Sequence, residues 1–523
     1  MLMDEQESQL TRRDLLVRGG GAAASLGLLG KIGLLGAEED AHAALKPKRG
    51  GVAKIALNTA NQNLNPVTHS AQVDFFLTWN MYRGLTNYDV KKKDFVLDMA
   101  EDFSVSRNGK IWTYKLRKGI LYHDGGEVVA KDVKFSVDTK VNPKNKSFWL
   151  TSYPVGIKTE VVDKYTVRFV LPRRSVQLPS ALAQGPGHIF PQRAYKNLGS
   201  KPMGCGPFEF VSWTKGQQVV MKRFNNFFHG APYLDRIIWV TIPEGSSRVS
   251  SLLAGDVQII DQVPFEQIAS LKKNGAIKMV LFPSTWIDFM LFNCTTPPFN
   301  NPEARNAIAM AVDREALAKI ATVGTGSAAS TLVSSWSPVR PTVKVLPYDP
   351  AQAQAIVKKL NLGSKQLRLL TSSADFPAWG RFAQYVAASA QKVGFNVTIQ
   401  DIDLGTWVQR SITTRDFEMS ICGFIYGIEA DQRTYAQLNS KGALNWGGYN
   451  GGAGLDALTE AQRAELNPTK RAADLSKLWQ QAENQSAWYT PYVVPGAQAT
   501  AKNVQNYHFH PEFYPLMDKV WLS

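Results

Sequence analysis

The sequence predicts a mixed α/β fold that is divided into more than one lobe. Residues 90–185 carry several strand patterns, and residues 366–400 follow the order strand, helix, strand. The length of 523 residues is enough for two to four domains. Because 44% of the side chains are hydrophobic and 20% are charged, the composition excludes a disulfide-stapled scaffold, a collagen-like polymer and a mainly disordered chain.

The first 43 residues predict a twin-arginine export signal. Arg12 and Arg13 precede a stretch rich in Gly, Ala and Leu from Gly19 to Gly36, and Ala41-His42-Ala43 has the pattern of a cleavage site. A membrane anchor is the competing interpretation. It is disfavoured because only about a dozen residues lie between the flanking basic residues, too few to cross roughly 30 Å of hydrocarbon.

The chain is basic, with a formal net charge of +15. Residues 1–43 carry four basic and seven acidic side chains, so their removal raises the net charge to +18. A basic excess suggests nucleic acid, an anionic membrane surface or an acidic ligand as a partner. Its clusters, Lys91–Lys93 and Arg173-Arg174, are short and no nucleic-acid-binding motif accompanies them, so we expect no binding to nucleic acid.

The segment between residues 44 and 185 predicts mainly strands. Val52–Leu57 is a short apolar run typical of a buried strand. Lys110–Leu116 and Tyr165–Leu171 alternate apolar and polar residues as half-buried strands do. Residues 130–139 fit either a helix or a strand, because apolar residues there recur at a spacing that suits both.

From about residue 245 helices become more frequent. A helix that ends at Gly255 precedes a strand at residues 257–260, and Pro302 is expected in the first turn of a helix that extends to Leu317. In the βαβ unit, Gly394 closes the helix. The remaining predicted elements are helices after Gly452 and Pro468 and short strands at residues 492–494 and 520–521.

The sequence offers little material for catalysis or metal binding. It has no G-x-x-x-x-G-K-[ST] loop for phosphate, no G-x-S-x-G motif and no H-E-x-x-H motif. The three cysteines, Cys205, Cys294 and Cys422, are widely spaced and supply neither a metal site nor a disulfide framework. The sequence leaves open a single disulfide between two of them. We therefore expect no enzyme activity, no metal and no cofactor.

Several tryptophans stand in polar surroundings rather than in apolar runs. They are Trp286, Trp379, Trp407 and Trp446, the last of these close to Tyr449. Each one alone fits a core position. As a set they suit a site that grips a ligand through large, rigid faces with few polar contacts.

The chain resembles a known family, the extracytoplasmic solute-binding proteins of the peptide/nickel class, family 5, that serve ABC importers. The resemblance covers nearly the whole chain after the export signal, and it rests on many short motifs in the same order. These motifs are Leu64-Asn65-Pro66, Met81-Tyr82-Arg83-Gly84-Leu85-Thr86, Asn108–Gly119, Tyr122-His123-Asp124-Gly125, Ala130-Lys131-Asp132-Val133, Gly204-Cys205-Gly206-Pro207-Phe208, Pro232-Tyr233-Leu234-Asp235, Leu253-Ala254-Gly255-Asp256-Val257, Arg305-Asn306-Ala307-Ile308 and Trp446-Gly447-Gly448-Tyr449.

The resemblance implies a two-lobed periplasmic-binding-protein fold of type II, with an extra β-rich domain inserted in the first lobe. The implied division gives lobe I residues 44–70, 186–290 and 500–523, the extra domain residues 71–185, and lobe II residues 291–499. In such proteins a ligand favours closure of the lobes about a hinge. The closed form then delivers the solute to an ABC permease whose ATPase subunits are separate chains, and the protein is expected to be a periplasmic monomer.

The family's ligand contacts map to short segments of both lobes. The lobe I contacts are Ser70, Ala71 and Gln72, and the lobe II contacts are Trp407, Gly423, Phe424, Ile425, Tyr426 and Gly427, to which we add Trp446. Peptide binders read Gly-Trp-x-x-Asp in the second segment, and the Asp neutralises the α-amino group of the peptide. Here Phe424 and Gly427 replace the Trp and the Asp, which leaves Glu429 or Asp431 as substitutes.

The resemblance does not name the ligand. A peptide, an opine, a modified amino compound or an oligosaccharide all fit, and nickel fits less well because His69 is the only histidine near the mapped residues. One alternative function is a periplasmic enzyme that uses Ser70, Cys422 or Tyr426 with His69 as base. Another is a chaperone that binds unfolded peptides.

Overall fold

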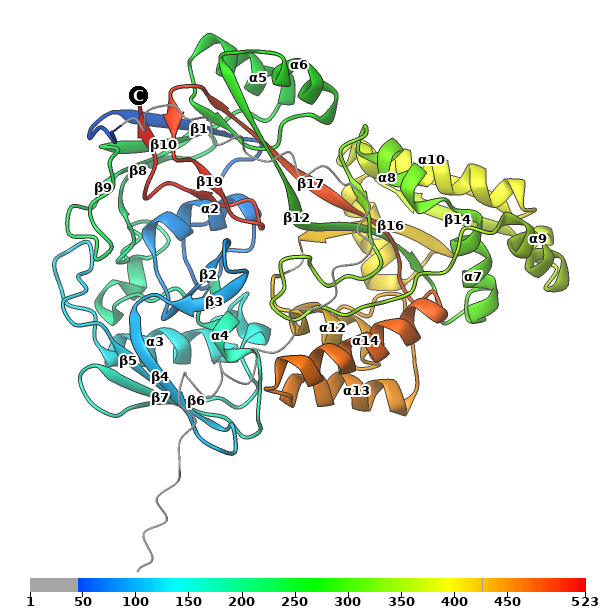
Figure 1. The fold of residues 1–523 in the computed structure, drawn as a ribbon, viewed down its shortest axis with the longest axis horizontal. Helices are drawn as coiled ribbons and strands as arrows, with labels where there is room; N and C mark the ends of the chain where they lie inside the picture. The colour runs from blue at the N-terminus through cyan, green and yellow to red at the C-terminus, as the bar shows by residue number, and fades with distance from the viewer. Residues whose placement is uncertain (1–45, 184, 426) are drawn as a thin grey trace, which may run out of the picture.

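The computed structural model describes residues 46–183, 185–425 and 427–523 (Figure 1). The predicted export signal at residues 1–43 and the predicted contact Tyr426 lie outside these residues. A large mixed sheet runs through the molecule in the strand order β15-β14-β16-β12-β17-β11-β1-β10-β9-β8. The fold is the two-lobed α/β fold that the sequence predicts, with one half of the sheet in each lobe.

Lobe I contains the half of the large sheet that includes the first strand of the chain. Its strands are β1 (Val52–Leu57), β8 (Phe208–Thr214), β9 (Gln218–Arg223), β10 (Arg236–Thr241) and β11 (Ile259–Ile260). β1 forms where the apolar run predicts it and pairs in parallel with β10 and β11. The helices α5 (Gly245–Ala254), which ends at Gly255 in a left-handed conformation, and α6 (Ile268–Lys272) belong to the same lobe.

The helix α2 (Gln72–Met81) also belongs to lobe I by its packing. Its buried residues Phe76, Leu77 and Met81 join β1, β9 and β10 in one hydrophobic core. The implied division assigns this helix to the extra domain, which starts at residue 71, whereas its burial joins it to the core of lobe I.

The extra domain is built on a four-stranded antiparallel sheet covered by one long helix (Figure 1). The strands, in sheet order, are β4 (Ala100–Val105), β5 (Ile111–Leu116), β7 (Thr166–Val170) and β6 (Lys158–Val161). The segment that was ambiguous in the sequence is the helix α3 (Ala130–Val141). Val133 and Val137 lie one turn apart and are both buried in the core of this domain, which selects the helical period.

Lobe II contains the predicted βαβ unit. β14 (Gln366–Thr371) and β15 (Asn396–Asp401) pair in parallel, and α10 (Pro377–Lys392) connects them. Gly394 follows the helix with a φ of 103°, a conformation that favours glycine. The other long elements of the lobe are α7 (Pro302–Ala311), α8 (Arg314–Ala321), α9 (Pro350–Lys359), β16 (Met419–Ile425), α12 (Asp431–Leu438), α13 (Ala453–Ala464) and α14 (Pro468–Asn484).

The helix predicted from Pro302 to Leu317 is in fact two helices. Val312 leaves the helical conformation at the end of α7, and Asp313 then caps α8 by accepting hydrogen bonds from the backbone N–H groups of Glu315 and Ala316. The carboxylate satisfies N–H groups that have no partner within the helix. The apolar spacing continues across the break, so it did not reveal the change of direction.

Two strands connect the lobes, and the sequence did not predict their length. β12 (Ile277–Phe292) and β17 (Tyr489–Ala501) pair with each other along most of their length and pass from lobe I into lobe II (Figure 1). Pro283 of β12 lies opposite Pro495 of β17, and the register shifts between Pro283 and Ile287. Proline cannot donate a ladder hydrogen bond, so the pairing is weakest where the strands leave lobe I.

Candidate solute-binding site between the lobes

The lobe II part of the predicted site lies on the end of β16, beside β12. The register pairs Asp288 with Gly423, Ile287 with Phe424, and Trp286 with Ile425. Side chains alternate across a strand, so Ile425 shares a face of the sheet with Trp286 and Asp288, while Phe424 lies on the other face. Ile425 and Trp286 pack against the core of lobe I, and Phe424 packs against the core of lobe II. The end of β16 therefore joins the two cores.

The carboxylate of Asp288 organises this face. The residue is 1% exposed. Its Oδ1 accepts hydrogen bonds from Trp286 Nε1 at 2.8 Å and from Trp379 Nε1 at 3.1 Å, and its Oδ2 accepts one from the Tyr492 hydroxyl at 2.7 Å. Burial raises the pKa of Asp288 to about 6, although the three donors favour the charged form. The carboxylate thereby holds the indole rings of Trp286 and Trp379 in position.

Gly423 is a glycine because this network needs the space. A Cβ atom at position 423 would collide with Asp288 Oδ1 and would lie 2.8 Å from Trp286 Nε1 and 3.0 Å from Trp379 Nε1. No side chain fits where the two indole N–H groups converge on one oxygen. The family motif placed Gly423 at the ligand, and the structure gives it a second role in positioning the tryptophans.

Three rings form what we call the aromatic wall: Trp286, Phe376 and Trp379. Phe376 stacks on Trp379 with ring centroids 4.2 Å apart, and Trp286 lies 6.1 Å from Phe376. Trp286 and Phe376 are partly exposed, whereas Trp379 is buried behind them. Large rigid faces with one side free are suited to hold the apolar part of a solute.

Two of the predicted contacts lie outside this wall. Trp407 is 2% exposed, packs against Trp379 at 5.3 Å and donates its Nε1 hydrogen to Ser420 Oγ at 2.9 Å. It is a core residue that supports the wall, and its direct contact with a solute stays a prediction. Trp446 packs against Phe424 at 5.0 Å on the opposite face of the sheet.

The position of the missing aspartate is filled by an amide. A Cβ atom on Gly427 would overlap the carboxamide of Gln432, the second residue of α12. Neither substitute carboxylate is free. Glu429 pairs with Arg471 at 2.5 Å, and Asp431 pairs with Arg463 at 3.0 Å; both acids are buried. The expectation that one of them replaces the aspartate is wrong, because each already neutralises an arginine of α13 or α14.

The lobe I part of the site lies where α2 begins. Ser70 is exposed, Ala71 precedes the helix, and Gln72 is its first residue. Ala71 packs against the hydrophobic core of lobe I, the same core against which Ile425 and Trp286 pack. That Ser70, Ala71 and Gln72 contact the solute stays a prediction from the resemblance.

The lobes also touch away from the connecting strands. The Tyr88 hydroxyl, on β2 (Thr86–Asp89), donates to the Trp336 carbonyl at 2.5 Å. The Val176 N–H donates to the Arg463 carbonyl at 2.9 Å, beside an ion pair of 2.9 Å between Arg173 and Glu460. These contacts join the extra domain to lobe II. The described conformation is therefore one in which the two halves are in contact.

Two of the residues considered for catalysis, His69 and Cys422, are core residues. His69 is fully buried, its Nε2 lies 3.0 Å from Thr78 Oγ1, and burial lowers its pKa to about 3. Cys422 is also fully buried, and burial raises the pKa of its thiol well above the usual value. A buried protonated thiol is a poor nucleophile. Cys205, Cys294 and Cys422 are free thiols.

Two absences hold for residues 46–183, 185–425 and 427–523. Within those ranges no group of three or more His, Cys, Asp or Glu side chains could hold a metal ion. None of the helices that they form is long and apolar enough to span a membrane.

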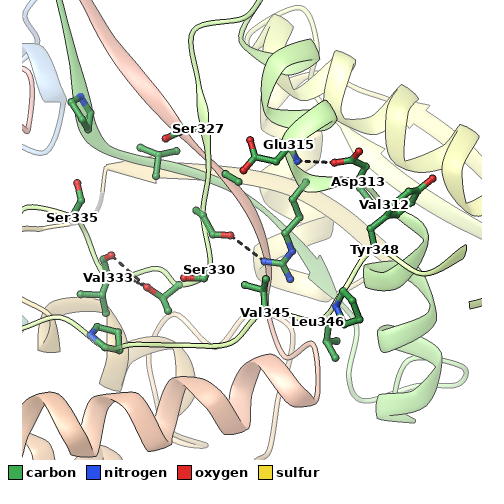
Figure 2. Close-up of a pocket in the computed structure, with 18 of the residues that line it drawn as sticks. Val312, Asp313, Glu315, Ser327, Ser330, Val333, Ser335, Val345, Leu346 and Tyr348 are labelled. Carbon is green, nitrogen blue, oxygen red and sulfur yellow. Dashed lines mark hydrogen bonds between the residues drawn. The ribbon is translucent and has the colours of Figure 1, made fainter. Parts of the chain in front are cut away.

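A pocket of about 620 Å³ lies elsewhere, on lobe II. Figure 2 shows Asp313, Glu315 and Tyr348 on one side of it and Ser330, Val333 and Ser335 on the other. Pro283 and Val493 of the connecting strands also line it. None of the predicted site residues does, so the pocket is separate from the aromatic wall.

The comparisons with known proteins agree with this architecture. Residues 94–446 match the family model of bacterial extracellular solute-binding proteins, family 5 Middle. The glutathione-binding protein GsiB of Salmonella paratyphi A is 26% identical to this chain, over 88% of this chain and 92% of that protein.

Solved structures give the same answer for the fold. The ABC transporter substrate-binding protein CtaP of Listeria monocytogenes superimposes with a TM-score of 0.83 at 21% identity, over 91% of this chain and all of that one. The oligopeptide-binding protein AppA of Bacillus subtilis, solved with a nonapeptide, superimposes with a TM-score of 0.77 at 22% identity over the same shares. The chain belongs to the family 5 bacterial extracellular solute-binding proteins.

Proposed function

We propose that this protein captures a solute between lobe I and lobe II and delivers it to the permease of an ABC importer, with ATPase subunits on separate chains. One observation carries the proposal. Ala71, which precedes α2 in lobe I, and Ile425 of β16 in lobe II pack against one hydrophobic core, and β16 pairs with β12, which crosses between the lobes together with β17. A site shared by two lobes links binding to closure, because a ligand that contacts both lobes favours the conformation in which they meet.

The connecting strands supply the hinge in this proposal. Between Pro283 and Ile287, β12 leaves its register with β17, and the Thr285 N–H bonds instead to the Pro511 carbonyl at 3.0 Å. The Ser284 hydroxyl donates to the Val494 carbonyl at 2.5 Å. A ladder interrupted at this point, with strands intact on both sides, concentrates rotation in a few residues.

The solute in this proposal is a peptide or another small polar compound with an apolar or planar part. GsiB is named for glutathione and AppA was solved with a nonapeptide, and the aromatic wall suits the side chain of such a ligand. Export through the twin-arginine route would place the protein in the periplasm, where we expect it to work as a monomer.

Binding measurements with and without the aromatic wall test the proposal. Calorimetric titration of a library of peptides, opines and oligosaccharides should identify a solute that binds wild type. Trp286→Ala should weaken the binding of that solute about tenfold or more, because it removes the exposed face of the aromatic wall. Trp213→Ala, on the half-buried strand β8 of lobe I, is the matched control and should leave the affinity unchanged.

Two results would contradict the proposal. One is a library, extended to the compounds that co-purify with the protein, in which no member binds. The other is a solute whose affinity survives Trp286→Ala while a variant in the 620 Å³ pocket, such as Ser330→Trp, abolishes its binding. The second result would move the site from the junction to the pocket shown in Figure 2.

A further inference from the structure

Three carboxamides are linked by hydrogen bonds at the lobe I side of the junction. Asn58 Nδ2 donates to Gln262 Oε1 at 2.8 Å, and Gln262 Nε2 donates to Gln72 Oε1 at 3.3 Å. We call these residues the amide relay. The family motifs point to Gln72 alone among them, and neither Asn58 nor Gln262 belongs to any mapped segment.

The sheet topology explains why the three meet. Asn58 directly follows β1, Gln262 follows β11, and these strands run parallel. Their carboxyl ends therefore open at the same edge of the sheet, which is where open α/β sheets bind ligands. Gln72, the first residue of α2, is the third member of the amide relay.

The backbone holds Gln262 in an uncommon conformation. Its φ is 50°, in the left-handed region, which is unfavourable for a residue with a side chain. Two contacts fix it there. Arg248 Nη2 donates to the Gln262 carbonyl at 2.9 Å, and the preceding Asp261 accepts a hydrogen bond from Gln498 at 3.0 Å. The fold thus maintains a strained residue that aims its amide at Asn58 and Gln72.

The relay has a direction, and it ends on a donor. Each link uses the NH₂ group of one residue and the oxygen of the next, so the last NH₂ group belongs to Gln72. Gln72 Nε2 is shielded from solvent and has no hydrogen-bond partner among the described residues. A buried donor without an acceptor is unfavourable, and hydrogen bonds in a chain polarise one another, so this group favours an oxygen acceptor.

The acids on the opposite side of the junction are enclosed or paired. Asp288 is 1% exposed and accepts three hydrogen bonds from neutral donors, Glu429 and Asp431 pair with arginines, and the Gln432 carboxamide takes the place of the family's aspartate. An ammonium ion buried beside the Gln432 carboxamide would lack a carboxylate in direct contact, which is costly.

From these observations we infer that the amide relay is the lobe I subsite of the solute and that it binds a carbonyl or carboxylate oxygen, in a solute that needs no free ammonium group. The inference rests on the proposed function and specifies its solute class. When the lobes close without solute, Gln72 Nε2 has no acceptor. An acceptor oxygen on the solute supplies one, so the relay contributes to the preference of the solute for the closed form.

Paired peptide pools test the inference. Each pool of di- and tripeptides is prepared with free amino termini and again with acetylated ones, and thermal shift and calorimetry are measured on the full chain after signal removal. We expect the acetylated pools to bind at least as tightly as the free ones. Gln72→Glu keeps the acceptor for Gln262 but replaces the free donor by a charge, and it should weaken binding about tenfold or more.

Gln217→Glu adds the same charge at an exposed turn between β8 and β9 and is the matched control, which should bind like wild type. Gln262→Leu breaks both links of the relay and should also weaken binding. The inference is overturned if only free-amine pools bind or if Gln72→Glu binds as tightly as wild type. Those results leave solute capture intact, whereas a failure of every pool and every co-purified solute to bind wild type contradicts the proposed function as well.

Discussion

Asp288 shows how a single residue outside the family motifs shapes the site. It is an acid within the apolar run of β12, and its carboxylate holds Trp286, Trp379 and Tyr492. A lone acid in a buried strand is a signal that the sequence offers, because a buried charge requires partners. Trp286 lies two residues away on β12, but Trp379 and Tyr492 come from α10 and β17, which no local pattern links to Asp288.

Two substitutions separate the geometry of Asp288 from its charge. Asp288→Asn can accept both indole N–H groups on its oxygen and donate to the Tyr492 oxygen, so the variant should fold. Asp288→Ala leaves three buried donors unfilled and should lower the free energy of unfolding by about 3 kcal/mol or more. Urea unfolding, followed by tryptophan fluorescence, measures both.

The same variants carry a pH prediction. Folding raises the pKa of Asp288 to about 6, above its value in the unfolded chain. The stabilising contribution of this group is thus complete below about pH 4 and is lost as the pH rises to 6. The free energy of unfolding of Asp288→Asn should therefore increase relative to that of wild type between pH 4 and pH 6. Above pH 6 it should not increase further. A difference in unfolding free energy between Asp288→Asn and wild type that does not change with pH would contradict the raised pKa of Asp288.

Among the elements, local patterns predicted those that depend on nearby residues. β1, the βαβ unit and the helices that begin at Pro302 and Pro468 follow from apolar spacing and from helix caps, and the structure confirms them. β12 and β17 were missed or shortened because both contain proline and pass between two cores. Their length is set by pairing with each other, which is information from distant parts of the chain.

The contact between the extra domain and α13 gives a prediction at this scale. Glu460→Arg places two like charges at the Arg173–Glu460 pair and should weaken the closed form. The expected loss of solute affinity is about two- to fivefold, because the side chains are 60% and 37% exposed and such pairs contribute at most about 1 kcal/mol. The double variant Arg173→Glu/Glu460→Arg should restore affinity; a double variant as weak as the single would mean that the pair does not act in closure.

For the whole molecule, the net charge says less about the ligand than the sequence suggests. The basic excess of +15 is not represented among the site residues, which are carboxamides in lobe I and aromatic rings in lobe II. The family resemblance mapped solute contacts to Ser70–Gln72 and to Gly423–Ile425, and the structure places Gly423–Ile425 beside β12, between the two cores. It could not supply Asn58, Gln262 or Phe376, because those residues reach the site only through the sheet topology and through the packing of α10.

In the proposed function, one solute contacts both lobes at once. A crystal structure of the protein, purified without denaturation so that it keeps its solute, tests this claim most directly. We predict solute density in contact with Gln72 of the amide relay and with Trp286 of the aromatic wall. Density confined to one lobe, or to the pocket lined by Ser330 and Tyr348, would contradict it.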